Sequence, residues 1–240
     1  MAGCASDSMN VAKTLSGTPT VVKHGRNKLE LVVLRNAVVF SHPSEARKNG
    51  GTCHRLRARD ISRNSGEVSL IDFDRAALKQ FLDRNQDKTV AGRLVLAIRA
   101  VQRGPGKLEV AALDSGVDWV EGTKDQKPAE KGEVCYAAAQ LGVQPWTAAN
   151  GRPVKNLGEL FYNAKNDSVR TMLSSKPATV TDADKKKFVN VELDGKFVQH
   201  LATDPNCRGI IVFTRGGNTS IYFSSRDKAG KEPRLIVTVE

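Results

Sequence analysis

Short runs of Val, Ile, Leu and Phe alternate with polar residues along most of the chain, and clusters of Gly, Asn, Asp and Pro separate them. This spacing is typical of half-buried strands joined by turns. It predicts ten strands, over residues 29–34, 37–41, 54–60, 67–73, 93–101, 107–113, 188–193, 209–214, 219–224 and 234–239. The turns at Gly104 and Gly216 predict hairpins between their flanking strands. The expected fold class is all-β, an antiparallel β-sandwich of the jelly-roll type.

Helical periodicity is limited to short segments. Between Asp74 and Asn85 the apolar residues fall on one face behind an aspartate N-cap, and residues 197–202 have the length of a single turn. Residues 1–20 are rich in Ser, Thr, Ala and Gly and lack a hydrophobic period, so we interpret them as a flexible tail or tether. Residues 21–240 are predicted to form a single jelly-roll domain with one or two short helices and an irregular insertion near residues 125–187.

Charge is the most informative feature of the composition. The 240 residues include 37 Lys and Arg against 26 Asp and Glu, and the formal net charge of +11 favours polyanionic partners. Only two Trp and three Tyr are present, which excludes a large aromatic binding face. The longest apolar runs are far shorter than the roughly 20 residues of a membrane-spanning helix. Net charge alone does not indicate whether the partner is a nucleic acid, an anionic lipid or an acidic polysaccharide.

Catalytic motifs are missing from the sequence. It has no nucleophile elbow, no His-Glu-x-x-His, no phosphate-binding loop and no dinucleotide-binding glycine fingerprint. The four histidines show no second histidine or carboxylate at ligand spacing, and the four cysteines form no Cys-x-x-Cys. We therefore expect a protein that is not an enzyme and that uses no cofactor.

Arg55, Arg57 and Arg59 alternate with apolar residues. In a strand, residues two apart project from the same face, so three guanidinium groups would lie in a row at intervals of about 7 Å. Such a row suits carboxylates or sulfates, which arginine binds with two hydrogen bonds. The alternative is an exposed edge strand that charge protects against aggregation.

Two aromatic residues are candidates for stacking on a sugar ring. Tyr222 lies between Ile221 and Phe223, so it projects from the opposite face of its strand. Trp146, in the irregular insertion, is the second candidate. The run Lys185-Lys186-Lys187 follows two aspartates and is interpreted as a solvated loop.

Several motifs occur in the order found in one family of β modules. Near the C-terminus, Phe223, Ser225-Arg226-Asp227, Pro233 and an aliphatic strand follow one another. Upstream, Ile71-Asp72-Phe73-Asp74 and Asp118-Trp119-Val120-Glu121-Gly122-Thr123 match a strand ending in Phe-Asp and a Trp-x-Glu-x-Thr loop. With these motifs, residues 37–240 resemble the DNRLRE-type domain family, except between Asp125 and Lys187. We expect Trp119 to pack in its loop and Arg226 to pair with Asp227 or another nearby acid.

Members of the DNRLRE-type family are extracellular jelly-roll modules, and many are described as polysaccharide-binding. Together with the positive charge and the arginine row, the resemblance implies a non-catalytic module that binds an acidic or sulfated polysaccharide at a bacterial cell surface. The alternative is a structural or assembly protein of the cell envelope without glycan affinity, and nucleic-acid binding is a less favoured third reading. Modules of this general kind often hold a structural calcium ion, although no acidic cluster in the sequence identifies a site for one.

The first residues, Met1-Ala2-Gly3-Cys4, look like the end of a bacterial lipoprotein signal. Lipidation at Cys4 would anchor the chain to a membrane and place it in the cell envelope or outside the cell. The alternative is an accidental start with Cys4 as an ordinary thiol. Any disulfide is expected to join two of the other cysteines, Cys53, Cys135 and Cys207.

Overall fold

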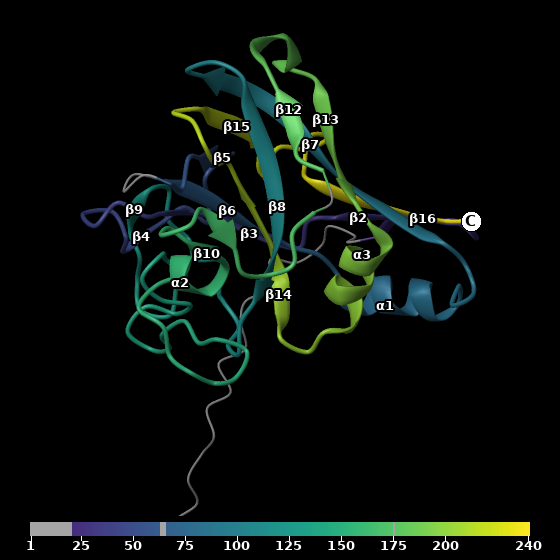
Figure 1. Cartoon of the computed structure of the whole chain (residues 1–240), viewed down its shortest axis with the longest axis horizontal. Helices are drawn as coiled ribbons and strands as arrows, with labels where there is room; N and C mark the ends of the chain where they lie inside the picture. Colours follow the sequence, from purple (N-terminus) through teal and green to yellow (C-terminus); the bar gives the residue numbers. More distant parts are fainter. Residues whose placement is uncertain (1–20, 63–65, 175) are drawn as a thin grey trace, which may run out of the picture.

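The computed structural model describes residues 21–62, 66–174 and 176–240. The tail predicted over residues 1–20, with the lipidation site proposed at Cys4, lies outside these ranges. The described chain is mostly antiparallel β-sheet, which confirms the predicted all-β sandwich (Figure 1).

Each of the ten predicted strands is present. They are β2 (Lys28–Val32), β3 (Arg35–Phe40), β5 (Arg55–Arg59), β6 (Glu67–Asp72), β7 (Val90–Gln102), β8 (Gly106–Asp114), β13 (Phe188–Leu193), β14 (Cys207–Phe213), β15 (Ser220–Ser224) and β16 (Arg234–Val239). The pattern did not predict six shorter strands, β1 (Val21–His24), β4 (Lys48–Asn49), β9 (Lys127–Pro128), β10 (Tyr162–Asn163), β11 (Ser168–Val169) and β12 (Ala178–Val180). Strands of two to four residues are too short for a period of two to stand out.

One large curled sheet forms the sandwich. Strands β1-β2-β16-β7-β15-β5, with β13 on β7, make one half, and β3-β6-β14-β8-β12 make the other. In the ladders, the pair Arg59 and Glu67 joins β5 to β6 and so connects the halves. The main core lies between them, with Leu96 and Phe223 from one half and Phe40 and Ile210 from the other.

The hairpins predicted at Gly104 and Gly216 are wrong. In the described ladders β7 pairs with β13, β15 and β16, whereas β8 pairs with β12 and β14. Arg103 and Gly104, with φ of 66° and 90°, therefore turn the chain from one half of the sheet to the other. The turn at Gly216 does the same between β14 and β15. A turn residue reverses the chain, but it does not decide whether the next strand pairs with the last or crosses to the facing layer.

The described residues contain three short α-helices, where one or two were predicted. They are α1 (Arg75–Asp83), α2 (Gly158–Phe161) and α3 (Gly195–Thr203), with a 3-10 turn, η1 (Asp182–Asp184). Asp74 caps α1 by accepting from Ala77 N at 2.9 Å, and Asp194 caps α3 by accepting from Phe197 N at 2.7 Å. α1 and α3 lie side by side (Figure 1). None of the described helices combines the length and the apolar character needed to cross a membrane.

Most of the predicted insertion is a folded layer with a core of its own. Residues 117–173 contribute buried side chains that pack against the outer face of β3, β6, β14 and β8, where Phe161 meets Phe213 with ring centres 5.4 Å apart. Trp146 is 0% exposed in this second core, and its Nε1 donates to Cys135 O at 3.1 Å. The prediction that Trp146 stacks on a sugar is therefore wrong, because a buried ring offers no face to a ligand.

The second core should contribute strongly to stability. We expect Trp146→Ala to lower the free energy of unfolding by about 3–5 kcal/mol, because it deletes a large buried side chain and leaves a cavity. Val143→Ala, at a site that is 56% exposed in the same segment, is the control and should change it by about 0.5 kcal/mol or less. Denaturant titration followed by circular dichroism measures both, and equal losses in the two variants would contradict the assignment of a second core.

Candidate functional site

The arginine row predicted from the sequence is present on β5. Arg55, Arg57 and Arg59 lie on one face of the strand, and the residues between them are buried on the other. Tyr222 is directly opposite Arg57 across the β5–β15 ladder, so the two side chains share that face. The candidates on these two strands therefore come together on the outer face of the sheet.

Internal contacts use part of this row. Arg57 Nη1 forms an ion pair with Glu67 Oε2 at 2.6 Å, and Arg59 Nη1 lies 3.6 Å from Glu67 Oε1. The Arg57 guanidinium carbon also lies 4.7 Å from the centre of the Tyr222 ring, so the guanidinium group covers one face of that ring. Burial raises the pKa of Glu67 despite the two arginines beside it. Arg55 is the exposed member of the row. The three guanidinium groups are therefore not equally free to bind a ligand.

The surroundings of β5 argue against edge protection as the reason for the row. β5 pairs along its whole length with β15. On the other side, the Ser69 hydroxyl of β6 accepts from Arg57 N and donates to Arg57 O, both at 2.9 Å. A strand with partners on both sides is not an open edge, so the alternative reading of this strand as an exposed edge is wrong.

A hollow of about 310 Å³ opens beside β7 and combines four cations with an aromatic ring. The side chains that give it this character are Arg99, Lys185, Lys186, Lys231 and Phe188. Phe188 is 52% exposed, an unusual position for such a large apolar side chain. Neither the lining of the hollow nor any other described residue provides an acidic partner to the four cations. We call this site the cationic hollow.

Backbone hydrogen bonds hold the lysines of the cationic hollow in place. Lys186 N donates to Ile98 O at 2.8 Å, and Ile98 N donates to Lys187 O at 2.9 Å. These two bonds attach the turn formed by Lys185, Lys186 and Lys187 to β7. The sequence analysis interpreted this turn as a solvated loop and did not predict its hydrogen bonds to β7. Its only sequence signal was a run of charge before a strand, because the β7 partner is far away in the chain.

A second hollow, of about 480 Å³, lies at the turn around Gly216 and carries balanced charge. Arg215 Nε and Nη2 donate to the two carboxylate oxygens of Glu109 at 2.9 and 2.7 Å, a bidentate pair. Lys107 and Asp167 complete the charged lining. With two cations and two acids, this hollow has no excess charge to attract a polyanion.

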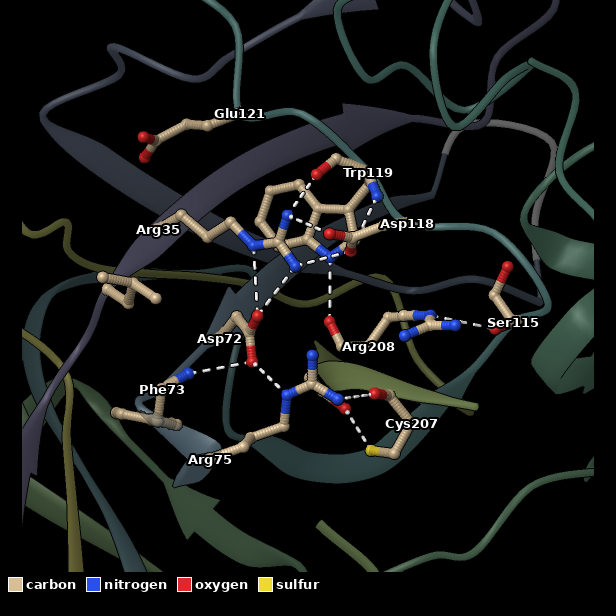
Figure 2. Close-up of polar contacts among 12 residues, drawn as sticks. Arg35, Asp72, Phe73, Arg75, Ser115, Asp118, Trp119, Glu121, Cys207 and Arg208 are labelled. Atoms are coloured by element: carbon tan, nitrogen blue, oxygen red, sulfur yellow. Dashed lines mark hydrogen bonds and ion pairs between the residues drawn. The ribbon is translucent and has the colours of Figure 1, made fainter. Parts of the chain in front are cut away.

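The Trp119 loop is a packing element, as Figure 2 shows. The Arg35 guanidinium carbon lies 4.3 Å from the centre of the Trp119 ring, and its Nη2 contacts Asp72 Oδ2 at 2.8 Å and Asp118 Oδ1 at 2.7 Å. Trp119 is fully buried, and its Nε1 donates to Arg208 O at 2.9 Å. The expectation that Trp119 packs in its loop is confirmed.

Glu121 joins the same loop to the C-terminal segment. Its Oε2 lies 2.7 Å from Arg226 Nη2, and its Oε1 accepts from Asn36 N at 2.8 Å. The expected pairing of Arg226 with an acid is therefore confirmed, and Glu121 is a closer partner than Asp227, at 3.9 Å. Burial raises the pKa of Glu121 to about 7, because the loss of hydration outweighs the nearby N–H group and the arginine.

The described cysteines are buried free thiols, Cys53, Cys135 and Cys207, with no disulfide among them. Burial is the main cause that raises the pKa of Cys207 to about 12. Its sulfur lies within 4.8 Å of ligand atoms of Asp114 and His200, and this is the single group of three or more metal-ligating side chains in the described ranges. Those ranges contain no comparable group of carboxylates of the kind that calcium prefers.

No family model matches the chain, and no curated protein matches it. The resemblance to the DNRLRE-type family therefore stays a prediction from the motifs quoted above.

Glu121 should make stability depend on pH. Its folded pKa of about 7 lies above the ordinary value of 4.5, so the folded state holds the proton more tightly and stability falls as pH rises between these values. Between pH 5 and pH 8 this group should cost about 2 kcal/mol of unfolding free energy. Glu121→Gln should lose that much less stability over the same interval in denaturant titrations. The control for one lost charge is Glu192→Gln, at an exposed position of β13, and parallel profiles for the parent and Glu121→Gln would contradict the shift.

Proposed function

We propose that this protein is a non-catalytic module that binds an acidic or sulfated polysaccharide, with the cationic hollow as its main contact. The observation that carries the proposal is a hollow lined by four cations and an exposed phenylalanine, without an acidic side chain. Carboxylates and sulfates would meet the cations, and the flat apolar face of a sugar ring would meet Phe188.

The strand register links the cationic hollow to the arginine row. Phe188 pairs with Ala97 on β7, and Ala100, three residues further along β7, pairs with Tyr222. The register of the β7–β15 ladder shifts between Tyr222 and Phe223, and this irregularity leaves Ala97 and Ala100 on the same face of β7. The residues beside them, Ile98 and Val101, belong to the main core on the other face. Directly opposed residues share a face, and Tyr222 in turn is opposite Arg57. The outer face of β13, β7, β15 and β5 thus offers a polymer a path from the cationic hollow to the exposed Arg55.

The composition of this face favours an acidic glycan over nucleic acid. Unspecific binding to single strands uses several aromatic platforms, whereas this face has Phe188 and a Tyr222 ring that Arg57 already covers. A polyuronate needs fewer rings, because each sugar carries its own carboxylate. A position at the cell surface, with a lipid anchor at Cys4, belongs to the same proposal and rests on the first residues of the sequence.

Neutralising the cationic hollow should weaken binding. We expect Lys185→Gln, Lys186→Gln and Lys231→Gln together to lower affinity for alginate-like or pectate-like oligosaccharides by about tenfold or more, since each lysine loses a charge-assisted contact. Isothermal titration at about 0.15 M salt measures this while long-range attraction is screened. Phe188→Ala should lower affinity without changing the charge.

A matched triple variant controls for net charge. Lys131, Lys155 and Lys165 are exposed on the segment that covers the other half of the sheet, and replacing them with Gln removes the same three charges. We expect its affinity to stay within about twofold of the parent. Equal losses in both triple variants would mean unspecific attraction. Tighter binding to DNA than to any polyuronate would favour the nucleic-acid reading, and no binding by the parent would favour the structural role in the envelope.

A further inference from the structure

Asp114, His200 and Cys207 bring three kinds of metal-ligating atom to one place. Asp114 and Cys207 are directly opposite each other across the β8–β14 ladder, so their side chains project from the same face. His200, near the end of α3, directs its Nε2 atom at Asp114 Oδ1, 2.7 Å away. The carboxylate oxygen, the ring nitrogen and the sulfur all lie within 4.8 Å of one another.

We propose that these three side chains bind a divalent transition-metal ion of the zinc class, with solvent as the fourth ligand. One sulfur, one nitrogen and one carboxylate oxygen make a donor set that suits Zn²⁺. Ca²⁺ and Mg²⁺ prefer oxygen ligands, so a thiolate argues against them. The side chains of His200 and Asp114 are 17% and 21% exposed, which leaves an approach for the ion and a water molecule.

The observed spacing needs only side-chain adjustment to hold such an ion. Ligand atoms about 2.0–2.3 Å from a tetrahedral zinc ion lie about 3.3–3.8 Å from one another. Asp114 and His200 would therefore separate from their present 2.7 Å, and two coordinate bonds would replace their hydrogen bond. Cys207 binds as the thiolate, so its proton passes to solvent when the ion enters.

Asp204 provides the outer contact that a metal-bound imidazole usually has. Its Oδ2 lies 3.5 Å from Nδ1 of His200, one helical turn away, while Nε2 faces Asp114. Asn206 N donates to Asp204 Oδ1 at 2.7 Å and so positions this carboxylate. A proton on Nδ1, directed at Asp204, leaves the lone pair of Nε2 available for the ion.

The backbone at Cys207 is held independently of any ion. Arg75 Nη1 donates to the carbonyl oxygen of Cys207 (Figure 2), and Arg75 Nε lies 3.4 Å from Asp72 Oδ1. On the other side, Cys207 N donates to Asp204 O at 3.2 Å. The ligands thus come from two strands and a helix whose positions are already set, as a preorganised site requires.

The same contacts would also suit a metal-free imidazolium held between Asp114 and Asp204. The two readings differ in the role of sulfur, because an ion pair of this kind makes no use of the Cys207 thiol. A metal ion, in contrast, would bind through it.

Titration with Co²⁺ separates the two readings. The chain, purified without a histidine tag, is titrated with Co²⁺ and followed by absorption spectroscopy. We expect a thiolate-to-cobalt charge-transfer band in the near ultraviolet that saturates at equimolar Co²⁺, and Zn²⁺ should displace the cobalt and abolish the band.

Variants assign the band to this site. Cys207→Ser should remove it, and His200→Ala should lower the affinity for Co²⁺ by about tenfold or more. Asp204→Asn should keep the band and weaken binding by about tenfold, as expected of an outer contact. Cys135→Ser, at a buried thiol outside the group, is the matched control and should leave the band unchanged. Circular dichroism shows whether each variant is folded.

Two results would overturn the proposal. One is the lack of a charge-transfer band in the parent chain, and the other is a band that persists in folded Cys207→Ser. If Cys207→Ser does not fold, Asp114→Asn and His200→Gln decide the question, because both nearly keep the size of the side chain. Unchanged Co²⁺ affinity in these two variants would equally exclude the site.

Discussion

Asp72 is a buried carboxylate at the end of β6, and its need for positive partners organises much of the molecule. An unpaired charge in such a place would be strongly destabilising. Arg35 of β3 and Arg75 of α1 meet it at 2.8 and 3.4 Å. Arg35 also holds Asp118 of the neighbouring loop, and Arg75 reaches the carbonyl oxygen of Cys207. One buried charge thus ties together two strands, a helix, a loop and the backbone of the proposed metal site.

Local patterns were sufficient to predict the ten longer strands but not which strands they pair with. Val68 to Ile71 is buried on both faces, because the main core lies on one side and residues 117–173 lie on the other. A sequence can show that such a run is buried, yet not what covers its second face. For the same reason Trp146 looked like a free aromatic residue in a loop. Gly104 indicated a turn, but the sequence did not show that the next strand, β8, pairs with β12 and β14 in the other half of the sheet.

The candidate sites were predictable to the extent that they are local. The shared face of Arg55, Arg57 and Arg59 depends only on the period of a strand, so it could be read directly. The cationic hollow depends on backbone bonds between Lys186 and Ile98, which no local pattern encodes. The proposed metal ligands come from β8, α3 and β14, with Asp114 far from the other two in the sequence, so no local spacing indicated the group. The sequence analysis also passed over Asp204, which lies four residues after His200 and is its outer contact.

The pairing of the C-terminal strands has a consequence for how the chain folds. β14 pairs with β6, where Ile210 meets Ile71, and β16 pairs with β2, where Val237 meets Leu29. Contacts between residues so distant in sequence require long loops to close before they stabilise anything, which slows folding. Neither half of the sheet is complete until β16 and β14, respectively, have been synthesised. Until then, earlier segments such as β2 and β6 keep an unpaired strand edge. During this time chaperones would protect them from aggregation.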